Sequence, residues 1–527
     1  MEEFCGGQLW NDSFTWNTDN PDFTPCFEST LFAWIPAAFL LIGIPFEIST
    51  YQSSTDRHLP FSVLSVTKLM LSLGMAGCVI AELLLLEKSV SSSQYVGPAV
   101  EMIAYLVTAI MTVTAMRNGV ITSGPQFVFW LVDSVCRALT FRTVANSYIE
   151  ADLPKEGSLR DKFILALAHL VGSVLLLLLN SFADKTTNVE YLKSRKPCPE
   201  YSASFFNRLV FSWGSHLMWT GWRKPLTPVD LWDISPRLAS KSLVPKFERL
   251  LNEQKSEHQD PTKKDARASE GDKKAQISIL PLLWRSFGGS FAMGSVLKLC
   301  CDLLNIASPR VMKLMIGFVE SWNAPEGSEI VKQEEWKGFL YAGLLFCVVT
   351  LQSILLSQYF EHMFVIGVKV RTTLISALYK KSLKISAAAK KESSMGEVVN
   401  LMSVDVQRFM DLLPYVNILW SAILQIGLCT FFIYEELGWP AFVGVAILFL
   451  SMPLNGVLAT LMRKLTLKQM KFKDARIKLM NEILGGMKVL KLYAWEPSFI
   501  GQVLKSSISP FFIFLRCLGS ETMKSRS

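Results

Sequence analysis

The chain has few of the residues and motifs that soluble enzymes and metal proteins need. Only 19% of its 527 residues are charged, half are apolar, and the mean hydropathy is positive at +0.31. Such usage excludes an ordinary soluble domain. The ten cysteines form no CxxC pair, which disfavours zinc and redox motifs, and we expect no metal site. The composition indicates a polytopic membrane protein.

A phosphate-binding loop is also missing. Such a loop follows the pattern GxxxxGK[ST], whose backbone amides cradle phosphate while the lysine reaches the terminal groups. Neither Gly-Lys-Ser nor Gly-Lys-Thr occurs anywhere in the sequence. Because ATP turnover needs this cradle and metal-holding residues, we expect no catalytic residue, no bound cofactor and no ATP hydrolysis by this chain alone.

Long apolar runs, by contrast, are abundant. A membrane-spanning helix needs roughly 20 apolar residues. Five runs come early, at residues 31–48, 61–86, 96–115, 126–141 and 163–182, and four come late, at 287–319, 339–368, 412–434 and 441–461. The sequence therefore predicts an all-α membrane protein with five helices over residues 31–182, a polar linker over 183–285 and about four helices over 286–504.

The distribution of charge predicts the orientation of these helices. Residues 1–30 hold acidic residues but no Lys or Arg, whereas the linker is rich in both. By the positive-inside rule, residues 1–30 are extracellular and the linker and C-terminus are cytoplasmic. No cleavable signal peptide is expected, because Glu2 and Glu3 open the chain in place of a basic region.

An extracellular N-terminus would give two local features a meaning. Asn11-Asp12-Ser13 matches the acceptor pattern for N-glycosylation, although this tripeptide is common by chance. Cys5 and Cys26 both precede the first apolar run, and an oxidising compartment would favour a disulfide between them. Two free thiols remain the alternative.

Two polar tracts with helical periodicity follow apolar runs, at residues 369–410 and 462–504. They predict membrane helices that continue into the cytosol as long stalks. Each stalk ends near a helix interruption, one at Ser-Ser-Met-Gly-Glu over residues 393–397 and the other at Gly485-Gly486 before an aromatic cluster.

Four segments carry a family resemblance. They are NDSFTWNTDNPDFTPCF (11–27), CPEYSASFFNRLVFSW (198–213), GEVVNLMSVDVQRFMDL (396–412) and RIKLMNEILGGMKVLKLYAWE (476–496). Together they resemble the multidrug-resistance-associated branch, subfamily C, of the ABC transporters over residues 11–504. The resemblance implies a five-helix N-terminal domain, a cytosolic linker and a partial type I exporter bundle, without nucleotide-binding domains.

The same resemblance implies a function. Members of the family are ATP-driven exporters of amphipathic organic anions, glutathione conjugates and drugs, act in the lipid bilayer, commonly the plasma membrane, and use ATP and Mg at nucleotide-binding domains that this chain lacks. No nucleic-acid partner is expected. The alternative is a non-transporting membrane interaction module, since the related sulfonylurea receptors use their five-helix domain to regulate a channel.

One candidate substrate contact is a lysine within an apolar run. Lys298 and Asp302 are four residues apart, so they share a helix face and could form a structural ion pair. A charge in lipid usually faces a bundle interior or cavity. By resemblance, Lys298 takes the place of the family lysine that contacts the acidic head of glutathione conjugates. Cys301 stands where better-known members carry a histidine, which weakens the expected preference for these conjugates.

Leu356, Phe360 and Tyr415 resemble the family positions that line an apolar pocket for the substrate tail. Stacking and dispersion at such positions would tolerate many shapes. Ordinary helix packing is the alternative for all three. Asp133 and Arg137, also four residues apart in an apolar run, are interpreted as a structural pair inside the N-terminal helices.

The stalk ends provide candidates for coupling to ATP hydrolysis. In the family these ends form short helices that dock into grooves on the nucleotide-binding domains. Gly396 and Glu397 would belong to one such helix, and Tyr493 and Trp495 would be aromatic anchors in the other. Packing within the stalks is the alternative for the two aromatic residues.

Three further segments lie outside the long apolar runs, two in the linker and one at the C-terminal end. Residues 198–232 mix aromatic and basic residues, as in an amphipathic segment at the membrane surface. Residues 252–276 are charged and poor in apolar residues, which predicts disorder. The tail, residues 505–527, diverges from the family pattern: Pro510 would interrupt a helix, and the apolar stretch after it is too short to cross a bilayer. We interpret it as a truncated or alternatively spliced end.

Overall fold

The described part of the chain consists of helices joined by turns and irregular segments, without strands. The computed structural model describes residues 2–53, 58–85, 91–150, 158–185, 196–235, 238–259, 278–323, 325, 332–385 and 395–504. It divides into two compact units, Met1–Ala422 and Ile423–Ser527. The tail at residues 505–527 lies outside the described residues.

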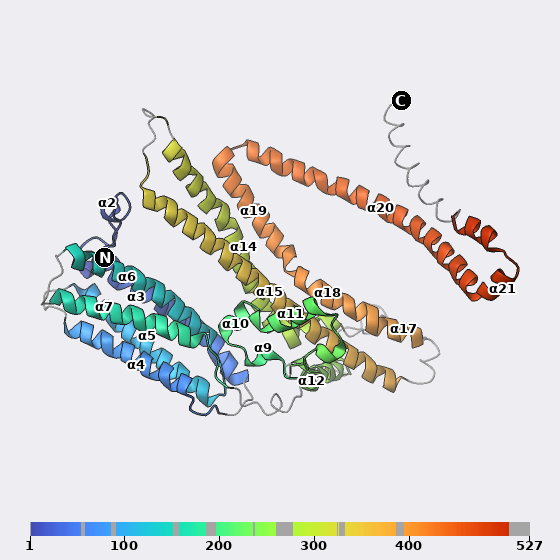
Figure 1. Cartoon of the computed structure of the whole chain (residues 1–527), viewed down its shortest axis with the longest axis horizontal. Coiled ribbons are helices and arrows are strands. Elements are labelled where there is room, and N and C mark those ends of the chain that lie inside the picture. The colour runs from blue at the N-terminus through green and yellow to red at the C-terminus, as the bar shows by residue number, and fades with distance from the viewer. Residues whose placement is uncertain are drawn as a thin grey trace. The chain divides into compact units, whose positions relative to one another are not determined.

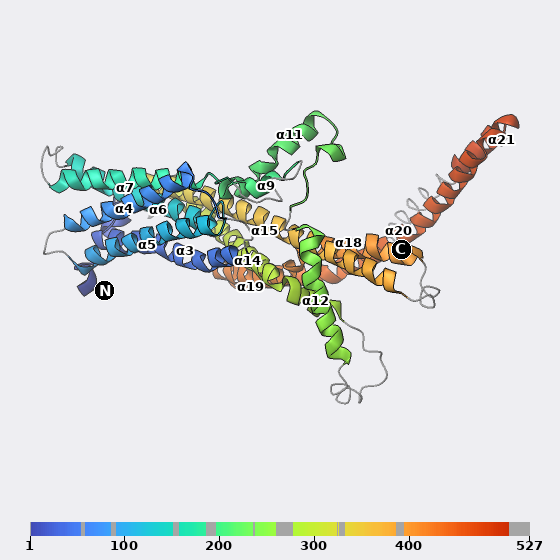
Figure 2. The same cartoon turned by 90° about the horizontal axis from the view of Figure 1, so that it is seen from below.

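Five long helices form a bundle in the N-terminal part of the first unit, as Figures 1 and 2 show. They are α3 (Pro25–Ser53), α4 (Val63–Leu84), α5 (Ser92–Arg117), α6 (Gly124–Glu150) and α7 (Ser158–Asn180). α3 packs on α5 and α6, α4 packs on α5 and α7, and α6 packs on α7. The core is rich in large side chains, among which Tyr105 stacks on Trp130 with ring centroids 5.5 Å apart.

A charged cluster lies inside this bundle. Arg137 Nε lies 3.6 Å from Asp133 Oδ1, so the predicted pair forms, but Arg137 Nη2 makes a closer contact of 2.5 Å with Glu101 Oε2 on α5. The Tyr105 hydroxyl accepts a hydrogen bond from Arg137 Nη2 and donates one to Asp133, each 3.2 Å long. The arginine is thus shared between two carboxylates, which offsets the cost of burying its charge.

The segment before the bundle contains two short helices, α1 (Glu2–Cys5) and α2 (Asp12–Thr15), and a disulfide joins Cys5 to Cys26. This segment contacts the start of α15 (Glu335–Lys384). The rings of Trp16 and Trp336 meet edge to face with centroids 5.4 Å apart, and Trp336 Nε1 donates a 2.9 Å hydrogen bond to the Thr18 carbonyl. Residues more than 300 positions apart are therefore in direct contact.

The linker contributes helices that contact both the five-helix bundle and the later helix α15. They are α9 (Pro199–Ser202), α10 (Phe205–Leu209), η1 (Ser212–Gly214), α11 (Ser215–Arg223), η2 (Pro228–Asp230) and α12 (Ser240–Gln259). On one side, the ring of Phe127 in α6 lies 5.5 Å from that of Phe205. On the other side, Gln358 Nε2 of α15 donates to the carbonyls of Arg208 and Leu209.

Two predictions about the linker had different outcomes. In α11, Trp219 and Trp222 are 55% and 76% exposed, an arrangement that suits the predicted amphipathic segment. The prediction of disorder is wrong for residues 252–259, which continue α12. The charged end of this helix follows buried Phe247, which packs with residues of α14 and α15, so packing of its first half supports the helix. Residues 260–277 lie outside the described part.

The later helices are longer. They are α14 (Ile279–Asn323), α15, α17 (Met395–Asn400), a π-helical turn η4 (Leu401–Asp405), α18 (Val406–Val416), α19 (Ile418–Leu437), α20 (Pro440–Gly485) and α21 (Met487–Leu492). The boundary between the two units falls within α19. α15 and α20 run without interruption for 50 and 46 residues, longer than a bilayer requires, as the predicted stalks demand.

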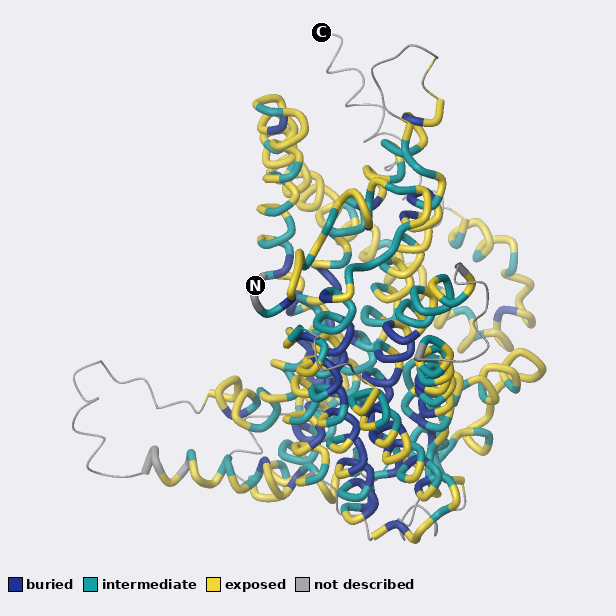
Figure 3. The backbone as a smooth tube through the Cα atoms, turned by 90° about the vertical axis from the view of Figure 1, so that its left-hand side faces the viewer, coloured by how far each residue is buried: buried dark blue, intermediate teal, exposed yellow. Residues whose placement is uncertain are grey.

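Eight helical segments of the described chain are long and apolar enough to cross a membrane. The predicted run at 126–141 lies in α6, which is not among the eight although it packs inside the five-helix bundle. Buried Asp133 and Arg137 lower its apolar content. In Figure 3, buried residues, in dark blue, gather where helices pack together, and exposed residues, in yellow, lie on the outer turns. Because many of these exposed side chains are large and apolar, they suit lipid contact.

Candidate functional site

The predicted substrate lysine forms an ion pair with its neighbour on α14. Lys298 Nζ donates to Asp302 Oδ1 at 2.6 Å, and the two side chains are 13% and 2% exposed. The second oxygen, Asp302 Oδ2, accepts a 2.5 Å hydrogen bond from Ser421 Oγ of α19. Both carboxylate oxygens are therefore engaged, which compensates for burying the charge.

A second polar contact links the same helices at Asn417, a fully buried residue at the break between α18 and α19. Its Oδ1 atom accepts hydrogen bonds from Ser295 Oγ at 2.9 Å and from Trp420 Nε1 at 3.1 Å. Nearby, the Tyr359 hydroxyl donates a 2.7 Å bond to the Pro414 carbonyl in the last turn of α18. Carbonyls in the last turn of a helix lack helical partners, so Tyr359 of α15 satisfies this one, while Ser295 of α14 contacts the side chain of Asn417.

The structure brings two of the three predicted apolar residues together. Leu356 and Phe360 are half-buried and pack against one cluster that includes Tyr359 and Met363. Tyr415 lies outside this cluster and is 55% exposed. Cys301 is buried, at 3% exposure. For Leu356 and Phe360, the alternative of ordinary helix packing therefore describes their contacts in this structure.

The geometry leaves Lys298 able to bind a further group. An ammonium carries three N–H donors, and among the described residues Lys298 makes one hydrogen bond, to Asp302. The adjacent Leu297 packs against the same buried cluster as Leu356 and Phe360. A cation and an apolar surface thus lie on neighbouring positions of α14.

The predicted coupling residues occupy the two stalk ends. Gly396 and Glu397 are exposed in the first turn of α17. In the second unit, Tyr493 and Trp495 follow α21, are 65% and 53% exposed, and stack with ring centroids 5.2 Å apart. Ala494 between them adopts a left-handed backbone with φ of 52°, and Trp495 N donates to the Leu490 carbonyl at 3.2 Å. A tight turn therefore holds the two rings together on the surface.

The predicted glycosylation site lies at the start of α2. Asn11 is the N-cap, and its Oδ1 atom accepts hydrogen bonds from Ser13 N at 3.1 Å and from Ser13 Oγ at 2.7 Å. The described residues contain no group of three or more metal-ligating side chains suited to a metal ion.

Sequence reasoning did not identify the partners that hold Lys298 and Asp302 in place. Ser421 is 119 residues from Asp302, and Asn417 is 122 residues from Ser295. Their only signal in the sequence is a polar residue inside an apolar run, which does not indicate a partner.

Comparison with known proteins identifies the family. Residues 4–155 match the family model of the ABC transporter TMD0 domain, and residues 291–518 match that of the ABC transporter transmembrane region. The sequence is 37% identical over 532 residues to ATP-binding cassette sub-family C member 3 of Mus musculus. The chain belongs to subfamily C of the ABC transporters.

Other relatives in the subfamily show the same coverage. Identity is 36% to member 3 of Homo sapiens and 32% to member 2 of Mus musculus. Each alignment covers 95% of this chain and 34% of the relative. The chain thus spans about a third of the length of the relatives that it matches.

Proposed function

We propose that this chain supplies membrane helices of an ATP-driven exporter of amphipathic organic anions, including glutathione conjugates and drugs. The observation that carries the proposal is Lys298, a cation within an apolar helix whose Nζ hydrogen-bonds only Asp302 among the described residues. An acidic head group would take the remaining donors of this ammonium. The substrate's apolar part would contact Leu356 and Phe360, with exposed Tyr415 as a further surface.

Energy would reach these helices through the stalk ends. The exposed stack of Tyr493 and Trp495 supplies a large, rigid apolar surface, a kind of surface that favours burial in a protein groove. We propose that it docks on a nucleotide-binding domain, where ATP and Mg would bind, and that Gly396 and Glu397 make the corresponding contact at the other stalk end.

We propose that the chain lies in the plasma membrane with residues 1–30 outside the cell. The support for this orientation is the absence of Lys and Arg from that segment and the Cys5–Cys26 disulfide. Asn11 would then be glycosylated. A shift in mobility on deglycosylation, lost in Asn11→Gln, would support this orientation, whereas glycosylation of an acceptor inserted into the linker would contradict it.

The transport proposal is tested in a full-length form that contains these residues. Membrane vesicles would take up an anionic conjugate and a neutral drug in the presence of ATP. With uptake expressed per amount of folded transporter, because the change also leaves buried Asp302 without its counter-ion, we expect Lys298→Met to weaken uptake of the anion about tenfold and to affect the neutral drug little. Lys313→Met, on the exposed side of the same helix, is the control.

Two outcomes would contradict the transport proposal. Equal losses for both substrates would assign Lys298 a purely structural role. Intact folding without ATP-dependent uptake of either substrate would favour the non-transporting interaction module.

A further inference from the structure

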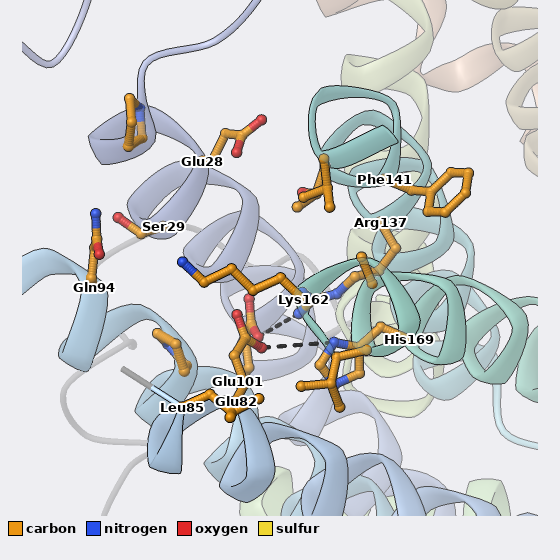
Figure 4. A pocket seen from close by; sticks show the side chains of 16 residues that line it. Glu28, Ser29, Glu82, Leu85, Gln94, Glu101, Arg137, Phe141, Lys162 and His169 are labelled. Carbon is orange, nitrogen blue, oxygen red and sulfur yellow. Dashed lines mark ion pairs between the residues drawn. The ribbon is translucent and has the colours of Figure 1, made fainter. Parts of the chain in front are cut away.

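A pocket with several ionisable lining residues lies inside the five-helix bundle, in a part of the sequence distant from Lys298. Its volume is about 230 Å³, and helices α3 to α7 all contribute to its wall. It lies toward the end of the bundle where α4 ends and where α3, α5 and α7 begin. Its ionisable lining residues are Glu28, Glu82, Glu101, Arg137, Lys162 and His169. Figure 4 shows Lys162 extending across the pocket from α7.

The deepest charges of the pocket are already paired. Glu101 and Arg137 form the 2.5 Å ion pair, and both side chains are 10% exposed. Because their charges cancel, the remaining ionisable groups decide the net charge of the pocket, and the Nε atom of Arg137, which does not contact Glu101, remains a donor. The remaining groups are two carboxylates, Glu28 and Glu82, one ammonium, Lys162, and the imidazole of His169, which is 2% exposed.

Four buried atoms of the lining have no hydrogen-bond partner among the described residues. They are Glu28 Oε1, Glu82 Oε2, His169 Nε2 and Arg137 Nε, whose 3.6 Å ion-pair contact with Asp133 Oδ1 is too long for a hydrogen bond. Glu82 Oε2 lies 3.7 Å from His169 Nδ1, a contact drawn as a dashed line in Figure 4. Buried polar groups without partners cost free energy, and most proteins satisfy them with protein, water or ligand atoms.

The unsatisfied atoms are of two kinds, and this decides the class of ligand. The two carboxylate oxygens only accept hydrogen bonds when ionised, whereas Arg137 Nε only donates and Lys162 adds further donors. A plain cation would satisfy the first kind and a plain anion the second. The described residues also contain no ligand cluster for a metal ion. A molecule that carries both charges engages the two carboxylate oxygens and Arg137 Nε together, whereas His169 Nε2 is not part of this set.

We propose that this pocket binds a small zwitterion with a primary ammonium and a phosphate, as in phosphoethanolamine. The ammonium donates to Glu28 Oε1 and Glu82 Oε2, and the phosphate accepts from Arg137 Nε and Lys162. The pocket volume of 230 Å³ corresponds to about eight water molecules. Phosphoethanolamine has a similar number of non-hydrogen atoms. Both a phosphatidylethanolamine headgroup and the free compound carry this chemistry, and the proposal does not depend on export.

The test uses the 527-residue chain in two kinds of nanodisc, one of phosphatidylcholine alone and one that also contains phosphatidylethanolamine. Soluble phosphoethanolamine or phosphocholine is added to the nanodiscs of phosphatidylcholine alone. Native mass spectrometry counts bound molecules, and the thermal midpoint reports stabilisation. We expect the primary-ammonium compounds to bind about tenfold more tightly than the trimethylammonium compounds, because only a primary ammonium donates hydrogen bonds to the carboxylates. Binding from the membrane alone identifies the lipid as the source, and binding of the soluble compound identifies the free zwitterion.

Variants then test the individual contacts. Glu28→Gln, Glu82→Gln and Lys162→Met should each weaken the primary-ammonium ligand about tenfold. Asp161→Asn, beside Lys162 but outside the lining, and Lys185→Met, beyond the other end of α7, should leave binding unchanged. Equal binding of ethanolamine and choline compounds by the unaltered chain, or binding of neither, would overturn the proposal even if a variant fails to fold.

Discussion

Replacing Asp302 by leucine should show how much its ion pair with Lys298 contributes to the stability of the packed helices α14 to α19. The change leaves the ammonium, in a side chain 13% exposed, without its counter-ion, and removes the hydrogen bond between Ser421 Oγ and Asp302 Oδ2. Breaking a buried pair from one side costs about 3–5 kcal/mol. Because Lys298 keeps some exposure, we expect a loss of about 3 kcal/mol in the free energy of unfolding.

The double variant Lys298→Met/Asp302→Leu should recover most of this loss. Apolar replacements of similar volume for both members of a buried pair are often neutral or stabilising. We therefore expect the double variant to lie within about 1 kcal/mol of the unaltered chain. The single changes should fail to add by about 2 kcal/mol or more.

The measurement is a double-mutant cycle by chemical denaturation in lipid-containing micelles. Arg249→Met and Glu253→Leu provide the matched control, because this pair is also spaced i to i+4 but its side chains are 83% and 51% exposed. Its coupling should be about 0.3–0.5 kcal/mol. If the Lys298 and Asp302 changes added within about 0.5 kcal/mol, the argument that burial makes this pair strong would be refuted.

Three further perturbations test other parts of the molecule. In a full-length form, Trp495→Ala should reduce substrate-stimulated ATPase activity and leave nucleotide binding nearly unchanged, because the exposed ring would transmit conformation and not touch phosphate; unchanged stimulation would assign it to packing. A hydrogen bond with Asp19 raises the pKa of Glu334, so the contact between these two side chains should hold at low pH and weaken as the pH rises through that pKa. Hydrogen exchange at residues 15–19 should therefore become faster as the pH rises through that range than the intrinsic exchange rate predicts. A pH dependence that persists in Glu334→Gln would contradict this assignment. Gly97→Ala would place Cβ against the Ser29 backbone carbonyl, and the resulting overpacking, which costs about 1–3 kcal/mol, should lower the thermal midpoint. Gly74→Ala, which has open space around it, should not lower the midpoint. Equal effects of the two changes would show that α3 and α5 can separate freely.

The sequence by itself determined the helices and their class. Whether a run of residues can cross a bilayer depends on its own length and apolar content, so eight of the nine predicted runs lie in helices that meet that requirement. The continuous helices α15 and α20 follow from periodicity in the same way. Four quoted segments were also sufficient to indicate subfamily C, which the comparisons confirm. The spacing of Asp133 and Arg137 predicted a pair, because residues four apart share a helix face.

Only the tertiary structure decided which distant residues meet. Glu101, the closest charged partner of Arg137, lies on another helix, and Ser421 reaches Asp302 from 119 residues away. The pocket between Glu28, Glu82 and Lys162 likewise exists only because five helices converge. Hydropathy and periodicity describe one helix at a time, whereas ion pairs and cavities depend on how helices rotate and pack against one another. A buried charge in the sequence therefore indicates that a partner is needed, and the packing of the helices selects that partner.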